Sequence, residues 1–192
     1  MAYREILDFW FLPAGAEGYG QPRNVWFTKD AAFDAMIGER FGATITLALG
    51  GGLREWDEAG PRGVLARILV LDQFTRNAFR ERPESFAGDP LALAAATALV
   101  DSGAHLQLSP LERWFAYMPF EHTEDAAMQE RSVALFTELA QQYEGFAGTL
   151  DYAHRHRGVI ARFGRFPHRN AILGRASTPE ELAYLSQPGS GF

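Results

Sequence analysis

Residues 30–52 read DAAFDAMIGERFGATITLALGGG, and this stretch carries the signals that decide the fold. Its large apolar side chains recur every fourth residue, at Phe33, Ile37, Phe41 and Ile45. That spacing places them on one face of an α-helix. Asp30 suits the N-cap of such a helix, and three consecutive glycines end the pattern. The stretch therefore predicts an amphipathic helix with one buried side.

Helix signals of the same kind recur along the chain, whereas alternating strand patterns are almost absent. Capping boxes begin at Ser109 and Thr178, and each is followed by a proline at the first helical position. Asp89, which precedes a proline, is predicted to cap a further helix. The predicted helices cover residues 3–11, 31–49, 61–79, 89–102, 110–118, 124–143 and 146–163, with a last one starting at residue 179.

The connections between these helices are short, which favours antiparallel helix pairs. After a Gly/Pro-rich loop at residues 13–23, no linker rich in Pro, Gly or Ser divides the chain, and no repeat of fixed period is visible. The sequence therefore predicts an all-α fold, an array of antiparallel helix pairs in a single domain covering residues 1–192.

The composition excludes several classes of protein. A chain of 192 residues, 47% of them apolar, can bury a core without disulfides or a structural metal, so no cofactor is expected. The absence of cysteine excludes disulfide frameworks, thiolate metal sites and cysteine nucleophiles. Acidic residues in the first eight positions argue against a secretory signal, and no apolar run is long enough to span a membrane. We expect a cytoplasmic protein without a membrane span.

The basic residues are unevenly distributed. The chain has a net charge of −6 and contains 17 arginines but one lysine, Lys29. Between Tyr152 and Pro179 there are six arginines, three histidines and no acidic residue, so this segment carries +6 and the remainder −12. An acidic remainder would repel a polyphosphate, which argues against nucleic-acid binding. Two interpretations stay open for the arginines: pairing with internal acids such as Asp72, Glu121, Glu124 or Glu130, or binding of an anionic ligand.

Several polar residues lie where apolar ones are expected. Asp72 and Arg76 fall in the middle of the apolar face of the helix predicted at 61–79, so an ion pair points at the core. His156 occupies the centre of the apolar face of 146–163, whereas His154 and Arg155 project outward. Each of these inward groups could be structural or functional. Ser132 also faces inward, and we expect its hydroxyl to bond to its own helix.

The link between the fifth and sixth predicted helices carries further candidates. Pro119 is expected to end one helix, which would place His122 and Glu124 at the start of the next. A histidine and a carboxylate there could shuttle a proton or bind a metal, or could simply cap the helix. The candidate catalytic residues are His122, Glu124 and His156. A metal site, the weaker alternative, would add His168.

Four motifs together resemble the DUF924 family of bacterial and eukaryotic proteins of unknown function. They are LDQFTRN at 71–77, FAGD at 86–89, YMPFEHTE at 117–124 and RFGRFPHRN at 162–170. The resemblance runs from Ile6 to Phe192 and departs at Thr123, where the family more often has serine. It implies a helical superhelix like that of tetratricopeptide-repeat (TPR) proteins. It implies no activity, since none is established for the family.

These observations lead to three functional hypotheses. The first is a site for a small carboxylate- or phosphate-bearing molecule, because arginine suits both groups. Its predicted binding residues are Asp72, Arg76, Asn77, Arg165, His168, Arg169 and Asn170. The second is a TPR-like scaffold that binds an acidic peptide or protein without chemistry. The third is a hydrolase or metal-dependent enzyme, although the chain has no GxxxxGK, GxSxG or HExxH motif. The sequence leaves the oligomeric state open.

Overall fold

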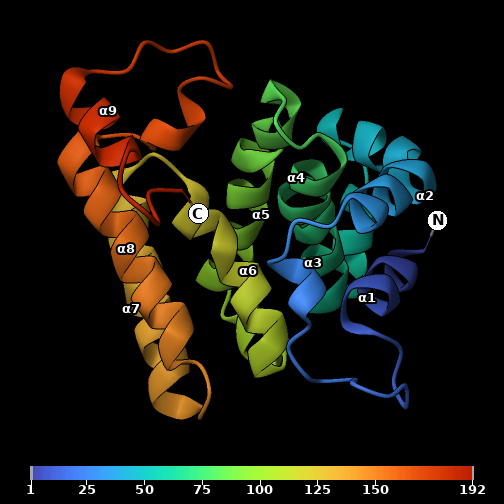
Figure 1. Cartoon of the computed structure of the whole chain (residues 1–192). Helices are drawn as coiled ribbons and strands as arrows, with labels where there is room; N and C mark the ends of the chain where they lie inside the picture. Colours follow the sequence, from blue (N-terminus) through green and yellow to red (C-terminus); the bar gives the residue numbers. More distant parts are fainter. Residues whose placement is uncertain (1, 192) are drawn as a thin grey trace. The chain divides into compact units, whose positions relative to one another are not determined.

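The computed structural model describes residues 2–191, and within them the chain forms helices, turns and loops but no strand. The all-α prediction is confirmed. Figure 1 labels nine α-helices in the described chain: α1 Tyr3–Phe11, α2 Ala31–Leu49, α3 Pro61–Leu69, α4 Thr75–Ala78, α5 Asp89–Asp101, α6 Pro110–His122, α7 Ala126–Gln142, α8 Ala147–Phe163 and α9 Pro179–Leu185.

The described chain divides into two compact units. Unit 1 comprises the chain up to Arg80 together with Glu84–Pro119, so it holds α1 to α5 and most of α6. Unit 2 comprises Glu81–Pro83 and the chain from Phe120 onward, so it holds α7 to α9.

The interior of unit 1 is built from aromatic rings. Trp10, Phe41, Phe74 and Phe115 are fully buried. Phe74 lies 5.0 Å from Phe41 and 5.6 Å from Trp10 between ring centroids, and Phe115 lies 5.5 Å from Trp10. Such contacts add to the stabilisation that comes from burying large apolar surfaces. The Gly/Pro-rich loop is fastened to this interior through Arg23, which donates to the carbonyls of Phe9 and Trp10 at the end of α1.

The predicted helix signals are confirmed at most ends. Asp30 caps α2 by accepting hydrogen bonds from the backbone N–H groups of Ala32 and Phe33. The capping boxes at Ser109 and Thr178 are both formed. The cap predicted at Asp89 is wrong, because Gly88 occupies the cap position and Asp89 is the first helical residue. Its carboxylate instead accepts two hydrogen bonds from Arg76.

The helix predicted at 61–79 forms, but with a π-helical turn over Val70–Phe74 between α3 and α4. Gly88 approaches this turn closely, since a β-carbon at that position would lie 2.0 Å from the carbonyl oxygen of Leu71. Only glycine fits there, which gives a physical reason for the glycine of the FAGD motif. The π-turn was not predicted from the sequence, although such turns are common at functional sites.

The predicted break at Pro119 is wrong. Helix α6 continues through Pro119 to His122, and α7 begins only at Ala126 with Asp125 as its N-cap. An interior proline removes one helical hydrogen bond. The helix end is held nevertheless, because the side-chain amide of Gln129 donates to the carbonyls of Glu121 and Thr123. His122 therefore lies in the last turn of α6, and Glu124 lies in the link between the helices.

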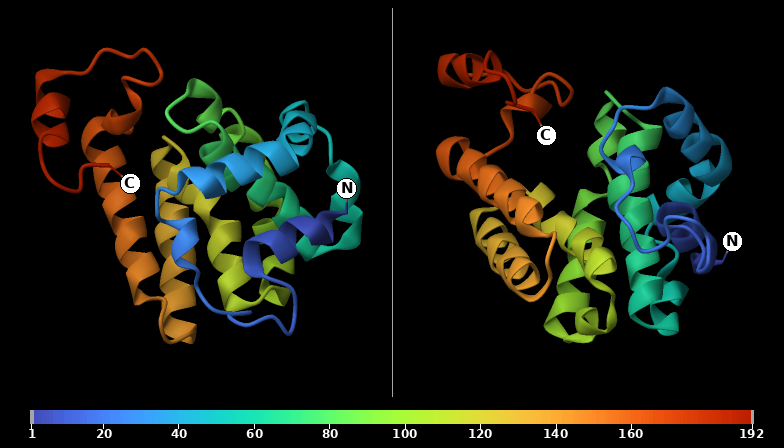
Figure 2. Two further views of the ribbon diagram at one scale, coloured as in Figure 1. Left: turned by 45° about the vertical axis from the view of Figure 1, so that its right-hand side comes forward. Right: turned by 60° about the horizontal axis from the view of Figure 1, so that its bottom comes forward.

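Unit 2 is organised by α7 and α8, which lie side by side in Figures 1 and 2. The two helices are joined by residues 143–146 and form an antiparallel pair. Phe136 and Ala153 are fully buried, as is Phe166, which follows α8. Ser132 is also fully buried, and within the described chain its hydroxyl has no hydrogen-bond partner. The hydrogen bond expected within its own helix is therefore absent.

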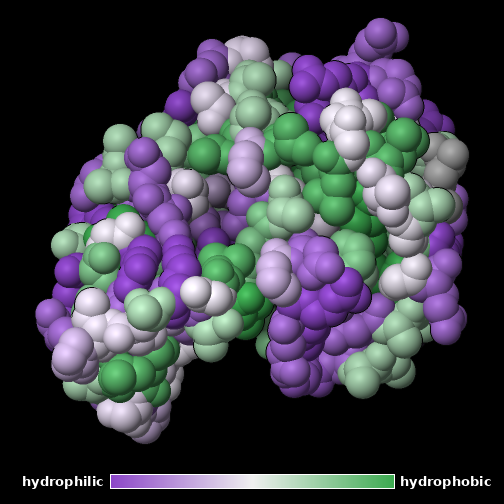
Figure 3. All heavy atoms as spheres, turned by 90° about the horizontal axis from the view of Figure 1, so that it is seen from above, coloured by the Kyte–Doolittle hydropathy of each residue, from purple (hydrophilic) through white to green (hydrophobic). Residues whose placement is uncertain are grey.

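The surface is mixed in character. On the face drawn in Figure 3, hydrophilic and hydrophobic residues are interspersed. Several large apolar side chains are exposed, among them Phe27 at 56% and Tyr152 at 52%. Among the described residues, no helix combines the length and apolar character that crossing a bilayer requires.

Candidate functional site

The predicted site residues fall in both units. Asp72, Arg76 and Asn77 belong to unit 1. The remaining predicted residues belong to unit 2: His122, Glu124, His156, Arg165, His168, Arg169 and Asn170.

In unit 1 the ion pair predicted inside the helix is confirmed. The side chain of Asp72 is almost fully buried, and Arg76 Nη1 lies 3.5 Å from its carboxylate. Arg76 also donates to both carboxylate oxygens of Asp89, at 2.8 and 3.1 Å, and its guanidinium lies over the ring of Phe86. Burial acts to lower the pKa of Arg76, but the carboxylates of Asp72 and Asp89 outweigh it and raise the pKa. Arg76 therefore stays charged and fastens α5 to the α3–α4 segment.

Asn77 has a similar structural contact. Its side-chain amide donates to Asp34 on α2 at 2.7 Å, and Arg80 donates to the same carboxylate at 2.6 and 2.8 Å. Burial acts to raise the pKa of Asp34, and the hydrogen bonds from Arg80 and Asn77 lower it below its usual range. These contacts join α2 to α4, so internal pairing accounts for this motif in unit 1.

In unit 2 the motif residues gather around the buried ring of Phe166. The histidine cluster, as we call it, comprises Glu121, His122, His156, Phe166, His168 and Arg169. The ring of Phe166 lies 5.5 Å from that of His156 and 5.6 Å from that of His168, and the Arg169 guanidinium lies 4.6 Å from its centroid. His122 lies 6.2 Å from His156 between ring centroids, and its carbonyl accepts a hydrogen bond from Arg169.

His156 is the most buried histidine of the cluster, at 4% exposure, as its position on the apolar face predicts. Its Nδ1 lies 2.9 Å from the carbonyl oxygen of Tyr152 and 3.0 Å from the carboxylate of Glu121. A carbonyl can only accept, so Nδ1 carries the proton and Nε2 of the neutral ring is an acceptor.

The electrostatic environment keeps His156 neutral. A carboxylate at 3.0 Å favours the charged imidazolium, but other effects are larger. Burial is the first of them, followed by electrostatic interactions with His122, His168 and Arg169, and together they lower the pKa of His156 to about 3. Burial is thus the main reason why this ring is neutral with Glu121 beside it.

Glu124 binds the backbone of the cluster at Phe166. It accepts a hydrogen bond from the N–H of Phe166 at 2.8 Å and two from Arg175, at 2.6 and 2.9 Å. Arg175 also donates to the carbonyl of Phe166. Burial acts to raise the pKa of Glu124, and Arg175 and the Phe166 amide lower it below its usual range. Glu124 is thus held as a carboxylate, which disfavours it as a proton donor.

Arg165 and Asn170 anchor the last helix. Arg165 donates to both carboxylate oxygens of Glu181, at 2.6 and 2.8 Å, and Asn170 donates to Glu181 at 3.3 Å. Glu181 also closes the capping box with Thr178. The Arg165 and Thr178 hydrogen bonds lower the pKa of Glu181 to about 2. Both predicted ligand residues therefore have a structural contact.

All six arginines of the basic segment have an internal partner, and five of these partners are carboxylates. The partners are Asp151 for Arg155, Glu130 for Arg157, Glu180 for Arg162, Glu181 for Arg165, the His122 carbonyl for Arg169 and Glu124 for Arg175. The structure confirms that these arginines contact internal partners, which was one of the two open interpretations. Binding of an anion to any of them stays a prediction.

The metal alternative finds no support in residues 2–191, where no group of three His, Asp or Glu side chains is arranged to hold a metal ion. His122, Glu124, His156 and His168 lie in one unit but do not form such a set. Glu124 accepts a hydrogen bond from Arg175, and Nδ1 of His156 contacts the Tyr152 carbonyl and the Glu121 carboxylate. A catalytic role for His122, Glu124 and His156 stays a prediction.

Three contributors to the cluster were not predicted as site residues. Phe166 lies at its centre. The carboxylate of Glu121 contacts His156, and Arg175 forms an ion pair with Glu124. The sequence offered Glu121 only as a possible partner for the arginines and Arg175 only as one of those arginines, because helical spacing says nothing about partners more than 30 residues away. The signal that could have identified Phe166 is its place between basic residues in RFGRFPHRN.

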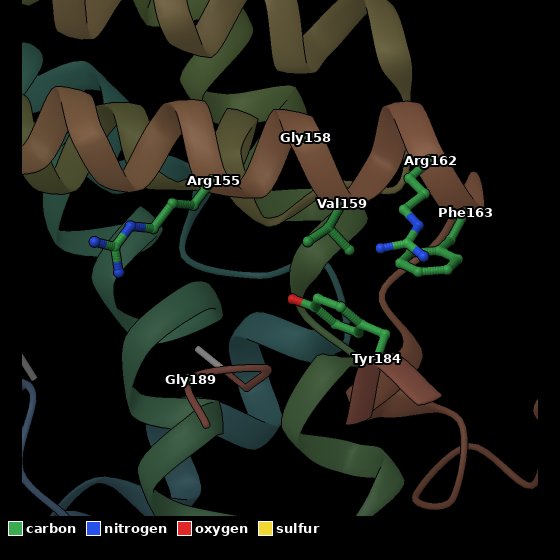
Figure 4. A pocket seen from close by; sticks show the side chains of 7 residues that line it. All are labelled: Arg155, Gly158, Val159, Arg162, Phe163, Tyr184 and Gly189. Atoms are coloured by element: carbon green, nitrogen blue, oxygen red, sulfur yellow. The ribbon is translucent and has the colours of Figure 1, made fainter. Parts of the chain in front are cut away.

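A separate hollow opens beside α8 (Figure 4). It has a volume of about 270 Å³ and is lined by Arg155, Gly158, Val159, Arg162, Phe163, Tyr184 and Gly189. None of these residues belongs to the histidine cluster.

Comparison with known proteins gives a family but no activity. The family model described as "Bacterial protein of unknown function (DUF924)" matches residues 6–189. The solved structure of ATU0120 from Agrobacterium tumefaciens, also a protein of unknown function, is similar over 96% of both chains, with 40% sequence identity and a TM-score of 0.81. No curated protein matches the chain.

Proposed function

This chain belongs to the DUF924 family of bacterial proteins of unknown function, and we propose that it binds a small carboxylate- or phosphate-bearing molecule at the histidine cluster of unit 2. The observation that carries the proposal is the convergence of His122, His156 and His168 with Arg169 around Phe166. Burying several ionisable groups together is unfavourable unless each is compensated, so such a set indicates a role beyond stability.

The charge balance of the cluster favours an anion. Glu121 is the carboxylate next to His156, yet the pKa of that ring is lowered, first by burial and then by His122, His168 and Arg169. An anion near the ring would offset the charge of Arg169 and of each histidine when it is protonated. His168 is partly exposed, whereas His156 and Arg169 are buried, so His168 is the member of the cluster that solvent reaches most readily. We therefore place the entry of the ligand at His168.

Histidine makes the proposed binding dependent on pH. An ordinary histidine is charged only below about pH 6.5, and an anion binds the charged form more tightly. By linkage, a bound anion raises the pKa of the histidines that it contacts. Binding is therefore expected to strengthen as the pH falls from 8 to 6.

The test uses inorganic phosphate and acetate as probes, followed by calorimetry and by histidine NMR signals at pH 6 and pH 8. We expect binding at pH 6 that weakens at pH 8. His168→Gln and Arg169→Gln should each abolish it. Arg157→Gln is the matched control, because it removes the same charge from the same segment at an exposed pair with Glu130. Unchanged histidine signals with both probes at pH 6 would contradict the proposal.

A TPR-like scaffold is the second candidate. What supports it is the antiparallel pair of α7 and α8, joined by residues 143–146, since helical repeats are built from such pairs. The partner would be an acidic peptide. A fluorescent oligoglutamate peptide separates the candidates: if the peptide binds and neither phosphate nor acetate does, the scaffold is favoured and the small-anion site is contradicted.

A further inference from the structure

The hollow beside α8 has two arginines at its ends. In Figure 4, Arg155 and Arg162 lie at opposite ends with Val159 between them. Their α-carbons are seven residues apart on one helix, which is two turns and about 10 Å along the axis. Both side chains are half exposed or more, at 59% and 50%. Solvent and solutes therefore reach both guanidinium groups.

The carboxylates that these arginines contact are themselves on the surface. Arg155 lies 2.9 Å from Asp151, and Arg162 lies 2.8 Å from Glu180, and both acids are more than 60% exposed. Exposed ion pairs of this kind contribute little to stability and exchange readily with solvent. A ligand carboxylate can replace Asp151 or Glu180 without disrupting a buried contact.

The space between the two arginines is apolar and open. Val159 is buried at its base, and the rings of Phe163 and Tyr184 stand 5.2 Å apart between centroids at one side. Gly158 adds no side chain, and a β-carbon there would meet no atom within 4 Å. The hollow thus offers an apolar middle bounded by two positive ends.

We propose that this hollow binds an elongated dicarboxylate, a molecule with an apolar chain between two carboxylate groups. Each carboxylate accepts paired hydrogen bonds from one arginine, and the chain packs on Val159 and the two rings. The carboxylates must lie on the order of 10 Å apart to reach both arginines. The hollow shares no residue with the histidine cluster, so this site does not depend on the function proposed above.

The probes are suberate, the shorter diacid succinate and the monoacid octanoate, measured by calorimetry on the full chain. Suberate is expected to bind at least about tenfold more tightly than either, because only suberate engages both ends at once. Equal affinities for suberate and octanoate, or no binding of suberate at millimolar concentration, would overturn the proposal.

Two glycines of α8 provide a matched pair of variants. Gly158→Leu fills the hollow, whereas Gly148→Leu adds the same side chain at an exposed position on the same helix, where a β-carbon also meets nothing within 4 Å. We expect Gly158→Leu to lose suberate binding by at least about tenfold and Gly148→Leu to keep it. Wild-type affinity in folded Gly158→Leu would overturn the site.

The exposed arginines keep the test valid should Gly158→Leu fold poorly. Arg155→Gln and Arg162→Gln are each expected to reduce suberate affinity to that of octanoate. Arg157→Gln, which removes an arginine of the same helix outside the hollow, is expected to leave suberate affinity unchanged. If Arg155→Gln and Arg162→Gln both bind suberate like the wild type, the two-ended mode is wrong.

Discussion

The side chains that surround the central buried ring differ between unit 1 and unit 2. The interior of unit 1 contains a group of packed aromatic rings, with Phe74 against Phe41 and Trp10, and its buried Asp72 is paired with Arg76. In unit 2 the buried ring of Phe166 is instead surrounded by histidine and arginine side chains. An aromatic core is explained by stability alone. A buried ring surrounded by histidines and an arginine is not, and this difference directs the functional proposal to unit 2.

The largest expected effect compares the two central rings. Phe74→Ala and Phe166→Ala should each destabilise the protein by about 3–5 kcal/mol, because both rings are fully buried. Phe166→Leu, which keeps most of the volume, should cost clearly less and still displace the histidine ring contacts. Urea unfolding measures the stability, and histidine NMR shifts report the cluster. If Phe74→Ala shifts the His156 signal as much as Phe166→Leu does, the contrast between the units fails.

The close approach in unit 1 gives the next effect. Gly88→Ala places a methyl group against the Leu71 carbonyl and should destabilise by about 3 kcal/mol, because neither partner is a flexible side chain. Gly42→Ala in α2 is the control, since a β-carbon there meets nothing within 4 Å. It should stabilise by about 0.5–1 kcal/mol through helix propensity. Similar unfolding midpoints for the two variants would refute the close approach.

The pH dependence of stability tests the electrostatics of unit 2. His156 titrates near 6.5 when unfolded and at about 3 when folded, so the stability from its neutral state is full above pH 6.5 and is lost as the pH falls toward 3. The loss between pH 6.5 and pH 5 should be about 2 kcal/mol. The pKa of Glu181 is lowered from 4.5 to about 2, so this residue adds a further loss of stability only as the pH falls below about 4.5. His156→Gln should flatten the curve between pH 7 and pH 5, and an unchanged slope would contradict the assignment.

The smallest effect concerns the arginines of unit 2. Arg165→Gln breaks a two-bond contact with Glu181 and should loosen α9, seen as faster proteolysis after residue 170. Arg157→Gln removes an exposed pair and should change stability by less than about 0.5 kcal/mol. Equal protease sensitivity of the two variants would show that Arg165 does not anchor α9.

Local signals explain how much of the fold was predictable. Asp30, Ser109 and Thr178 act through hydrogen bonds within three residues, so their helix starts were predicted correctly. Asp89 was misjudged because a guanidinium from another helix binds its carboxylate. Pro119 was misjudged because Gln129, ten residues later, supports the helix end beyond it. Tertiary contacts determine the helix ends near Asp89 and Pro119, and a local sequence pattern does not reveal such contacts.

The candidate site was predictable in its residues but not in its pairings. The inward direction of His156 and of the Asp72–Arg76 pair followed from helical spacing and is confirmed. The neutralisation of the +6 segment was one of two open interpretations. It is decided by acids such as Glu124 and Glu181, which lie outside that segment. Which acid pairs with which arginine is set by packing between segments that are distant in the sequence.

The titration of His156 in NMR, with and without inorganic phosphate, tests the central claim most directly. Without phosphate, we expect the ring to stay neutral down to about pH 4. Phosphate should raise the pKa of His156, and His168→Gln should remove that increase. An ordinary titration near pH 6.5 that phosphate does not move would contradict both the geometry of the cluster and its proposed role.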